Sequence, residues 1–157
     1  MTIVVRLAQP GEAEIVHRIM QAAFAEYQGA LPVDSGAHTE TVDDVRRAMD
    51  EGGAVLALDA DEPVGSARFR IEAEGLYVAR VSVLPQYRRR GVASAIMRFV
   101  EQLGRSGSRV RIGVRDSLPS NVGLYRSLGY QVTSVEPHPR GPDQVWTMIK
   151  TVPERNG

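Results

Sequence analysis

Stretches in which apolar and polar residues alternate recur along this chain, separated by segments in which apolar residues return at helical spacing. Alternation is typical of strands with one buried face. The stretches expected to be strands are residues 3–7, 54–58, 64–71, 76–84, 109–114, 131–135 and 144–151. Turns at 59–62 and near Glu74 and Gly75 join the strands between residues 54 and 84, which predicts an antiparallel meander.

The first two predicted helices precede this meander. One opens at Pro10 and Gly11, because proline is favoured in the first helical turn. Its apolar side carries Ile15, Ile19, Ala22 and Ala23. The other starts at Thr41, where Asp44 completes a pattern similar to a capping box, and it stops at Gly52. The residues between them, 28–40, are rich in Gly, Pro, Asp and Ser and are expected to form a loop.

Two further helices are expected in the second half of the chain. The apolar face of the third carries Val92, Ile96, Phe99, Val100 and Leu103. The fourth is short, runs from about Asn121, and ends at Gly129 as a left-handed cap. The resulting order is β-α-α-β-β-β-α-β-α-β-β, within a single domain over residues 1–157.

The connections decide the fold class. A strand, helix and strand over residues 76–114 require a crossover and hence a parallel pair, whereas the meander is antiparallel. We therefore expect an α/β (α+β) fold with a mixed, mostly antiparallel central sheet of about seven strands flanked by about four helices.

Residues 81–93 hold the first chemical motif, in which an apolar strand runs into Pro85, three arginines and Gly91. Gly91 stands at the mouth of a helix, so the free N–H groups of the first turn and the helix dipole form an anion site. A phosphate or pyrophosphate suits this site best. The same spacing, Arg88-x-x-Gly91-x-Ala93, is also compatible with a solvated basic turn that caps an ordinary helix.

A second motif follows the predicted strand at 109–114. It comprises Asn121, Leu124-Tyr125 and Leu128-Gly129-Tyr130. The two motifs, in this order and with a strand between them, resemble the GCN5-related N-acetyltransferase (GNAT) family, and the resemblance covers most of the chain. It implies a GNAT-like sheet that splays open between its two central strands to admit the cofactor.

The resemblance implies that acetyl-CoA is the acyl donor. The residues expected to bind it are Val81, Ser82, Val83, Arg88, Arg89, Arg90, Gly91, Val92, Ala93 and Asn121. The pyrophosphate would lie on the N–H groups from Arg89 to Ala93, and the pantetheine arm would pair with the strand backbone. The Val83 N–H would then donate to the thioester oxygen. Core packing alone also explains Val81 and Val83.

Tyr125 matches the position of the family's catalytic acid. A phenol beside the leaving sulfur can protonate the thiolate. The alternative for Tyr125 is an aromatic side chain that fills the gap between helix and sheet. Asn121 either caps its helix or hydrogen-bonds the pantetheine.

The sequence does not identify the base that takes a proton from the acceptor amine. Some family members place a glutamate on the central strand, at the position that is Tyr77 here. Glu26, Glu72 and Glu74 are the carboxylates considered instead, and Tyr77 could order a water that relays the proton. Glu26, Tyr27 and Tyr77 are expected to contact the acceptor. Segments expected to border it are 28–40, 74–75 and 137–142.

Composition excludes several function classes. With 19 basic and 19 acidic residues, the chain has no global field to attract nucleic acid or an anionic membrane. It shows no span-length apolar run and no signal peptide, so a cytoplasmic location is expected. Cysteine is absent and the three histidines are scattered, so we expect neither a metal site nor a cysteine-borne intermediate.

These observations predict an N-acetyltransferase that moves an acetyl group directly to a primary amine on a small molecule or peptide. One alternative is a non-catalytic acyl-CoA-binding regulatory module. Another is a different phosphate binder, but the chain contains neither a Gly-x-x-x-x-Gly-Lys-Ser/Thr loop nor a Gly-x-Gly-x-x-Gly run. Family members often dimerise, so a homodimer is a further expectation.

Overall fold

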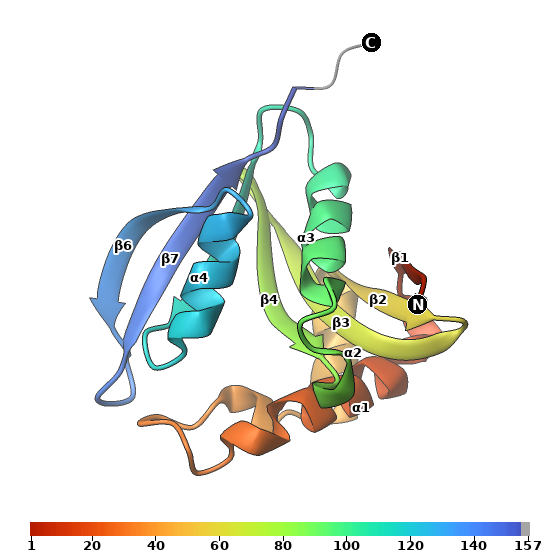
Figure 1. Ribbon diagram of the computed structural model, residues 1–157, viewed down its shortest axis with the longest axis horizontal. Helices are drawn as coiled ribbons and strands as arrows, with labels where there is room; N and C mark the ends of the chain where they lie inside the picture. The colour runs from red at the N-terminus through yellow and green to blue at the C-terminus, as the bar shows by residue number, and fades with distance from the viewer. Residues whose placement is uncertain (155–157) are drawn as a thin grey trace.

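A sheet with helices on both faces makes up the computed structural model, which describes residues 1–154 of the chain (Figure 1). Over those residues the sheet has seven strands in the order β1-β2-β3-β4-β5-β7-β6. The strands are β1 (Ile3–Leu7), β2 (Gly53–Asp59), β3 (Glu62–Glu72), β4 (Gly75–Val83), β5 (Arg109–Arg115), β6 (Gln131–Pro137) and β7 (Gln144–Thr151). The helices are α1 (Ala13–Phe24), α2 (Val42–Glu51), α3 (Val92–Leu103) and α4 (Pro119–Ser127). The predicted fold class and element order are confirmed.

The two faces of the sheet carry separate hydrophobic cores. On one face α1 and α2 pack through Val16, Ile19, Met20, Val45 and Leu56. On the other, α3 and α4 pack through Val78, Val92, Ile96, Ile112 and Tyr125. Each amphipathic helix thus buries its apolar stripe against the sheet. Among the helices of residues 1–154, none is long and apolar enough to cross a membrane.

The buried face of α1 differs from the prediction. Ile19 and Ala23 are buried as expected, but Ala22 is exposed. The inner stripe instead runs through Ala13, Val16, Met20 and Ala23, which recur at helical spacing, and α1 itself begins at Ala13 after a 3₁₀ turn at Pro10–Glu12.

Smaller differences occur in α3 and α4. Leu103 at the end of α3 is 38% exposed, whereas Met97 is fully buried. α4 begins at Pro119, two positions before Asn121, and proline suits the first helical turn. Gly129 has a φ of 96° and follows α4 in the left-handed conformation that was predicted.

The sheet forks between β4 and β5. The two strands pair in parallel through Gly75–Val78 and Arg109–Ile112. Beyond Val78, β4 continues only along β3, while β5 continues along β7. A bulge accompanies the change: the β3–β4 register shifts, and Arg80 adopts a left-handed φ of 54°. Because a bulge bends its strand, the second half of β4 turns away from β5, and the expected splay is confirmed.

Candidate active site

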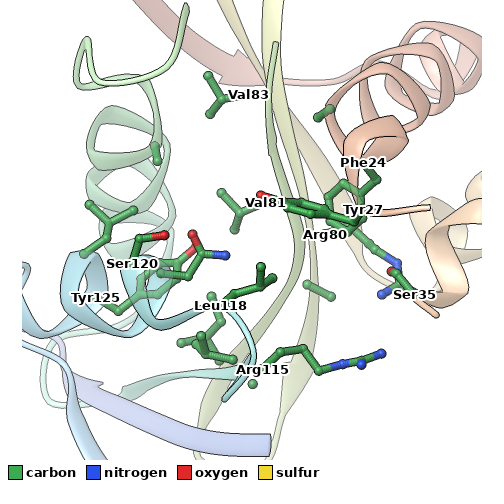
Figure 2. Close-up of a pocket in the computed structure, with 18 of the residues that line it drawn as sticks. Phe24, Tyr27, Ser35, Arg80, Val81, Val83, Arg115, Leu118, Ser120 and Tyr125 are labelled. Carbon is green, nitrogen blue, oxygen red and sulfur yellow. The ribbon is translucent and has the colours of Figure 1, made fainter. Parts of the chain in front are cut away.

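A cavity of about 740 Å³ lies in the fork. It is lined by β4, β5, α4, the start of α3, and parts of the 28–40 loop and the 137–142 link. Figure 2 shows Tyr125 of α4 on one side, Val81 of β4 in the middle and Tyr27, after α1, on the other. The cavity therefore joins the region of the predicted phosphate site to the region predicted to hold the acceptor.

The first turn of α3 forms the predicted anion cradle. Gly91 is its N-cap, with a φ of 80° that favours glycine. The first hydrogen bond of the helix runs from the Ala95 N–H to the Gly91 carbonyl at 3.0 Å. The amides of Val92, Ala93 and Ser94 therefore have no partner within the helix, and all three residues line the cavity. Ser94 was missed by the sequence analysis.

Arg88 is bound to the end of α1. Its guanidinium donates to the Ala23 carbonyl at 2.8 Å and forms an ion pair with the Glu26 carboxylate. Arg88 was assigned to the pyrophosphate and Glu26 to the acceptor from sequence. Both line the cavity, but the structure brings them to one another.

Arg89 and Arg90 lie differently. Arg89 lines the cavity and has a left-handed φ of 61°. The Arg90 guanidinium lies over the ring of Tyr87, 5.6 Å from its centroid. Arg90 is not one of the described residues that line the cavity. Of the two, Arg89 is therefore the better placed to meet a phosphate.

The edge of β4 that faces the fork offers backbone hydrogen-bonding groups. The Leu84 N–H donates to the Val64 carbonyl at 2.9 Å, and Val83 lies opposite Gly65. Hydrogen-bonded and non-hydrogen-bonded pairs alternate along an antiparallel ladder, so the Val83 N–H and C=O point away from β3 and into the fork. Val81 and Val83 line the cavity, whereas the Ser82 side chain is buried elsewhere.

Tyr125 lies on α4 with its side chain 5% exposed, and it lines the cavity. Burial raises the pKa of its phenol, so the group is protonated at neutral pH, as a proton donor must be. The neighbouring Tyr130 ring packs edge-on against it at 6.0 Å, but its hydroxyl donates to Glu101 at 2.9 Å. Of these two tyrosines, Tyr125 alone lines the cavity among the described residues.

Asn121 also lines the cavity. It is the third residue of α4, whose N-cap is Leu118 and has no side-chain cap bond. The capping role considered for Asn121 is therefore wrong. The other interpretation, a hydrogen bond from Asn121 to the pantetheine arm, stays a prediction.

The three residues expected at the acceptor all line the cavity: Glu26, Tyr27 and Tyr77. The Tyr77 ring lies between the guanidinium groups of Arg70 and Arg111, 4.4 and 4.3 Å from its centroid. These two contacts fix the ring on β4. Burial, followed by the nearby Glu26 charge, raises the pKa of Tyr27.

Two of the considered carboxylates lie away from the cavity. Glu72 is paired with Arg111, whose hydrogen bond lowers the pKa of the carboxyl and makes it a weak base. Glu74 pairs with Arg109 at the start of β5, at the opposite end of the parallel pair from the fork. The turn at 74–75 is therefore not a border of the cavity, and this expectation was wrong.

The segments 28–40 and 137–142 border the cavity as expected, through Leu31, Ser35, Gly36, His138 and Arg140. The cavity residues that were not identified from the sequence include Phe24, Arg80, Ser94, Arg115, Leu118 and Ser120. Arg80 carried a detectable signal, because it is a charge within the apolar run of β4. The others lie in loops or at element ends that only the tertiary fold brings together. His138 accepts the Arg140 N–H at Nδ1, so this nitrogen is not free to act as a base.

Among residues 1–154, no group of three or more His, Cys, Asp or Glu side chains is arranged to hold a metal ion. The polar groups described for the cavity are instead backbone amides, Tyr and Ser hydroxyls and arginines, together with the side chains of Glu26, Asn121 and His138. This set suits an elongated organic ligand that bears an anion.

Comparisons with solved structures agree with the fold. A GNAT family acetyltransferase from Bacillus cereus ATCC 10987 superimposes with a TM-score of 0.77 at 13% identity, covering 99% of this chain and 100% of that chain. YncA from Salmonella typhimurium, solved with its cofactor acetyl-CoA, gives a TM-score of 0.73 at 14% identity and covers 100% and 98%. At such identities the likeness concerns the fold alone.

Sequence comparisons extend the relation. The protein YyaT of Bacillus subtilis (strain 168) is 24% identical over 119 residues, which is 76% of this chain and 76% of YyaT. The model of the acetyltransferase (GNAT) family matches residues 16–130, a span that runs from α1 to the residue after Gly129 and includes both motifs. The forked sheet, the cradle at Gly91 and this match together place the chain in the GNAT acetyltransferase family.

Proposed function

We propose that the protein transfers an acetyl group from acetyl-CoA directly to a primary amine. The observation that carries the proposal is the meeting of three features on one cavity: the open edge of β4, the cradle at α3 and the buried phenol of Tyr125. These features suit, in turn, the pantetheine amides, the pyrophosphate and the thioester sulfur. The similar YncA, solved with acetyl-CoA, supports this choice of donor.

Acetyl-CoA supplies the acetyl group as a thioester. The Val83 N–H is directed into the fork and would donate to the thioester oxygen, with a hydrogen bond that strengthens as negative charge develops there. Amides at the start of α3 and the Arg89 side chain would hold the pyrophosphate. Asn121 faces the same cavity and would bind the arm between these two points.

The acceptor nitrogen forms a bond to the acetyl carbon, and the carbon–sulfur bond breaks. Tyr125 gives its phenolic proton to the departing sulfur and regains a proton from solvent. The proton released by the amine passes to a water molecule that is ordered by Tyr77, which lines the cavity. The chain contains no cysteine, so the acetyl group does not pass through a cysteine thioester.

A regulatory acyl-CoA-binding module is the second candidate. It is favoured by one observation: Glu26, the carboxylate among the described cavity-lining residues, is engaged by Arg88. A cavity without an unengaged carboxylate has no obvious base. The two candidates share a ligand and differ in turnover.

Two measurements decide between them. Calorimetric titration with acetyl-CoA, CoA and ATP tests the donor site, and release of free thiol in the presence of a panel of amines tests transfer. The transferase predicts tight acetyl-CoA binding with amine-dependent thiol release. Binding without release would favour the regulatory module, and preference for ATP would overturn both.

Other features of the proposal await their own tests. A single N-acetyltransferase domain over residues 1–157, a cytoplasmic location and a homodimer stay predictions. So does the expectation that nucleic acid and membranes are not partners.

A further inference from the structure

We propose that the acceptor is a small amine that carries an anionic group, bound by Arg80 with the support of Arg115 and Arg140. The inference rests on the proposed acetyl transfer and adds the chemical class of the acceptor. The observations behind this inference concern the end of the cavity that is lined by Tyr27 and Tyr77. The charges around this end decide which acceptors can enter.

Arg80 keeps hydrogen-bonding capacity for a ligand. Its Nε donates to Glu40 at 2.5 Å, while Arg68 forms an ion pair with the other oxygen of Glu40 at 2.6 Å. Two guanidinium groups thus share one carboxylate, which leaves one positive charge uncompensated. The Nη atoms of Arg80 donate no hydrogen bond to any residue that the structure describes, and Arg80 lines the cavity.

The position of Arg80 is fixed by its surroundings. It lies in the bulge of β4 with a left-handed φ, and its Nη2 would be 2.9 Å from a Cβ placed on Gly36. The guanidinium therefore lies against the 28–40 loop where that loop lacks a side chain. Figure 2 shows Arg80 and Arg115 reaching toward the side of the cavity that carries Ser35.

Arg115 and Arg140 hold the two bordering loops together. Arg115 donates from Nη1 to the Val33 carbonyl at 2.8 Å and from Nη2 to the Asp34 carbonyl at 3.4 Å. Arg140 donates to the same Asp34 carbonyl at 3.3 Å. The carbonyl that Arg140 contacts is neutral and leaves the charge of Arg140 in place, whereas Arg115 also donates to the Asp143 carboxylate at 3.2 Å.

The carboxylates near this end cancel only part of the positive charge. Asp143 forms an ion pair with Arg115 at 3.2 Å, which offsets the charge of that arginine, and it also accepts hydrogen bonds from the Ser117 hydroxyl and from backbone amides. The exposed Asp34 side chain accepts from the Gly29 N–H and forms no ion pair with Arg80 or Arg140 among the described residues. Along the whole cavity, the described lining residues include five arginines and one carboxylate, that of Glu26. In a chain of balanced charge, this concentration favours an anionic ligand group, because charge-assisted bonds to guanidinium are strong.

The contact between the two loops limits the size of the acceptor. Besides the arginine bonds, a Cβ on Gly141 would be 2.9 Å from a methyl group of Val33, so the Val33 side chain packs closely against Gly141. In Figure 1 the orange loop after α1 extends below the β6–β7 hairpin. This closed side accommodates a small molecule better than a peptide that must continue beyond its amine.

The first test compares matched amines with the wild-type protein. Short ω-amino acids of increasing chain length, the corresponding amino amides and aminoalkyl phosphonates are titrated by calorimetry in the presence of CoA. We expect the anionic amines to bind and the amides to bind at least about tenfold more weakly, as expected for a lost charge-assisted hydrogen bond. Equal or tighter binding of the amides would overturn the proposal, and the phosphonates distinguish phosphate from carboxylate recognition.

The second test changes the charge. Arg80→Gln should raise KM for the anionic amine about 10- to 100-fold, and should change KM for a neutral amine of the same length far less. Arg80→Lys should restore part of the preference. Arg109→Gln, which removes an arginine paired with Glu74 outside the cavity, is the matched control. If Arg80→Gln does not fold, Arg140→Gln, at an exposed position, reports the same preference with a smaller change.

The outcomes separate this proposal from the proposed function. Binding of anionic amines without thiol release would support the site and contradict the transferase. Thiol release that is as efficient with neutral amines as with anionic ones, with the KM of the anionic amine unaffected by Arg80→Gln, would support the transferase and overturn the anionic acceptor. Acetylation confined to acidic peptides would also overturn the proposal, because the acceptor would then be a macromolecule.

Discussion

The guanidinium of Arg88 donates to the Ala23 carbonyl at 2.8 Å and pairs with the Glu26 carboxylate, 62 positions away in the chain. This contact joins the turn before α3 to the end of α1 beside the cavity. The turn belongs to the proposed donor end, and Glu26 lies next to Tyr27 at the proposed acceptor end. The two ends of the site are therefore mechanically connected through one side chain.

Arg88→Ala should weaken both ends of the site at once. Loss of the bonds to α1 frees the Glu26 charge and releases the turn that leads to the cradle, so we expect the acetyl-CoA Kd and the amine KM both to rise. Arg89→Ala should raise only the acetyl-CoA Kd, because Arg89 lines the cavity without a bond to α1. Initial-rate kinetics and calorimetry measure the two effects. A change confined to the Kd in both variants would show that the connection has no functional consequence.

Tyr125→Phe should lower kcat about 10²–10⁴-fold with little change in acetyl-CoA affinity, as expected for loss of a general acid. Tyr130→Phe is the matched control, since it removes a buried hydroxyl that is bonded to Glu101. The control should lose about 1–3 kcal/mol of stability while keeping kcat. Single-turnover thiol release and thermal unfolding give the two readouts. Unchanged turnover in Tyr125→Phe would make Tyr125 a packing residue.

Gly91→Glu should abolish CoA binding. The left-handed φ strains any side chain there, and the carboxylate would oppose the phosphates at the start of α3. Gly107→Glu offers a close control, because Gly107 has a φ of 78° against 80° for Gly91, and at both glycines a Cβ would meet nothing within 4 Å. Both variants should lose roughly 1–2 kcal/mol of stability. Only Gly91→Glu should lose CoA affinity by calorimetry. Equal CoA affinities in the two variants would show that the first turn of α3 does not bind the phosphates.

Glu12 should make the free energy of unfolding depend on pH. Two hydrogen bonds from Arg6, at 2.7 and 2.9 Å, and one from the Gln9 N–H lower the pKa of Glu12 to about 2. A lowered folded pKa stabilises the protein above the ordinary value of 4.5, and this contribution is lost as the pH falls toward 2.

Glu12→Gln tests that pH dependence. We expect a Tm lower by about 2–4 °C at pH 7, with the difference from wild type shrinking between pH 5 and pH 3. Glu74→Gln, in an exposed pair with Arg109, should leave the Tm unchanged at every pH. A Glu12→Gln difference that stays constant with pH would contradict an ionic origin.

The sequence was sufficient for the order of strands and helices and for the cradle, because these follow from local periodicity and from Gly91. It did not reveal the face of α1, because alanines and apolar residues lie on more than one side of the helix and the packing against the sheet buries Met20 and exposes Ala22. Local pattern also placed the start of α4 too late, which made a capping role conceivable for Asn121, whereas the N-cap residue is Leu118 and makes no side-chain cap bond.

The basic acceptor end could not be found from sequence for a different reason. Arg80, Arg115 and Arg140 lie in three elements, and their proximity to one cavity depends on the fork and on the contact between two loops. The ion pair between Arg88 and Glu26 is likewise a product of the fold. Residue type predicts charge, but only the packing determines which charges are already paired.

The open edge of β4 has a consequence for solubility. A strand with unpaired backbone groups is a template for pairing with another chain, and proteins normally cover, charge or shorten such edges. Here the edge lies inside the molecule, with α3 and α4 packed against the two arms of the fork, so a second sheet has no access to it. The fold thereby keeps the edge of β4 accessible to a slender ligand and prevents a strand of another chain from pairing with it.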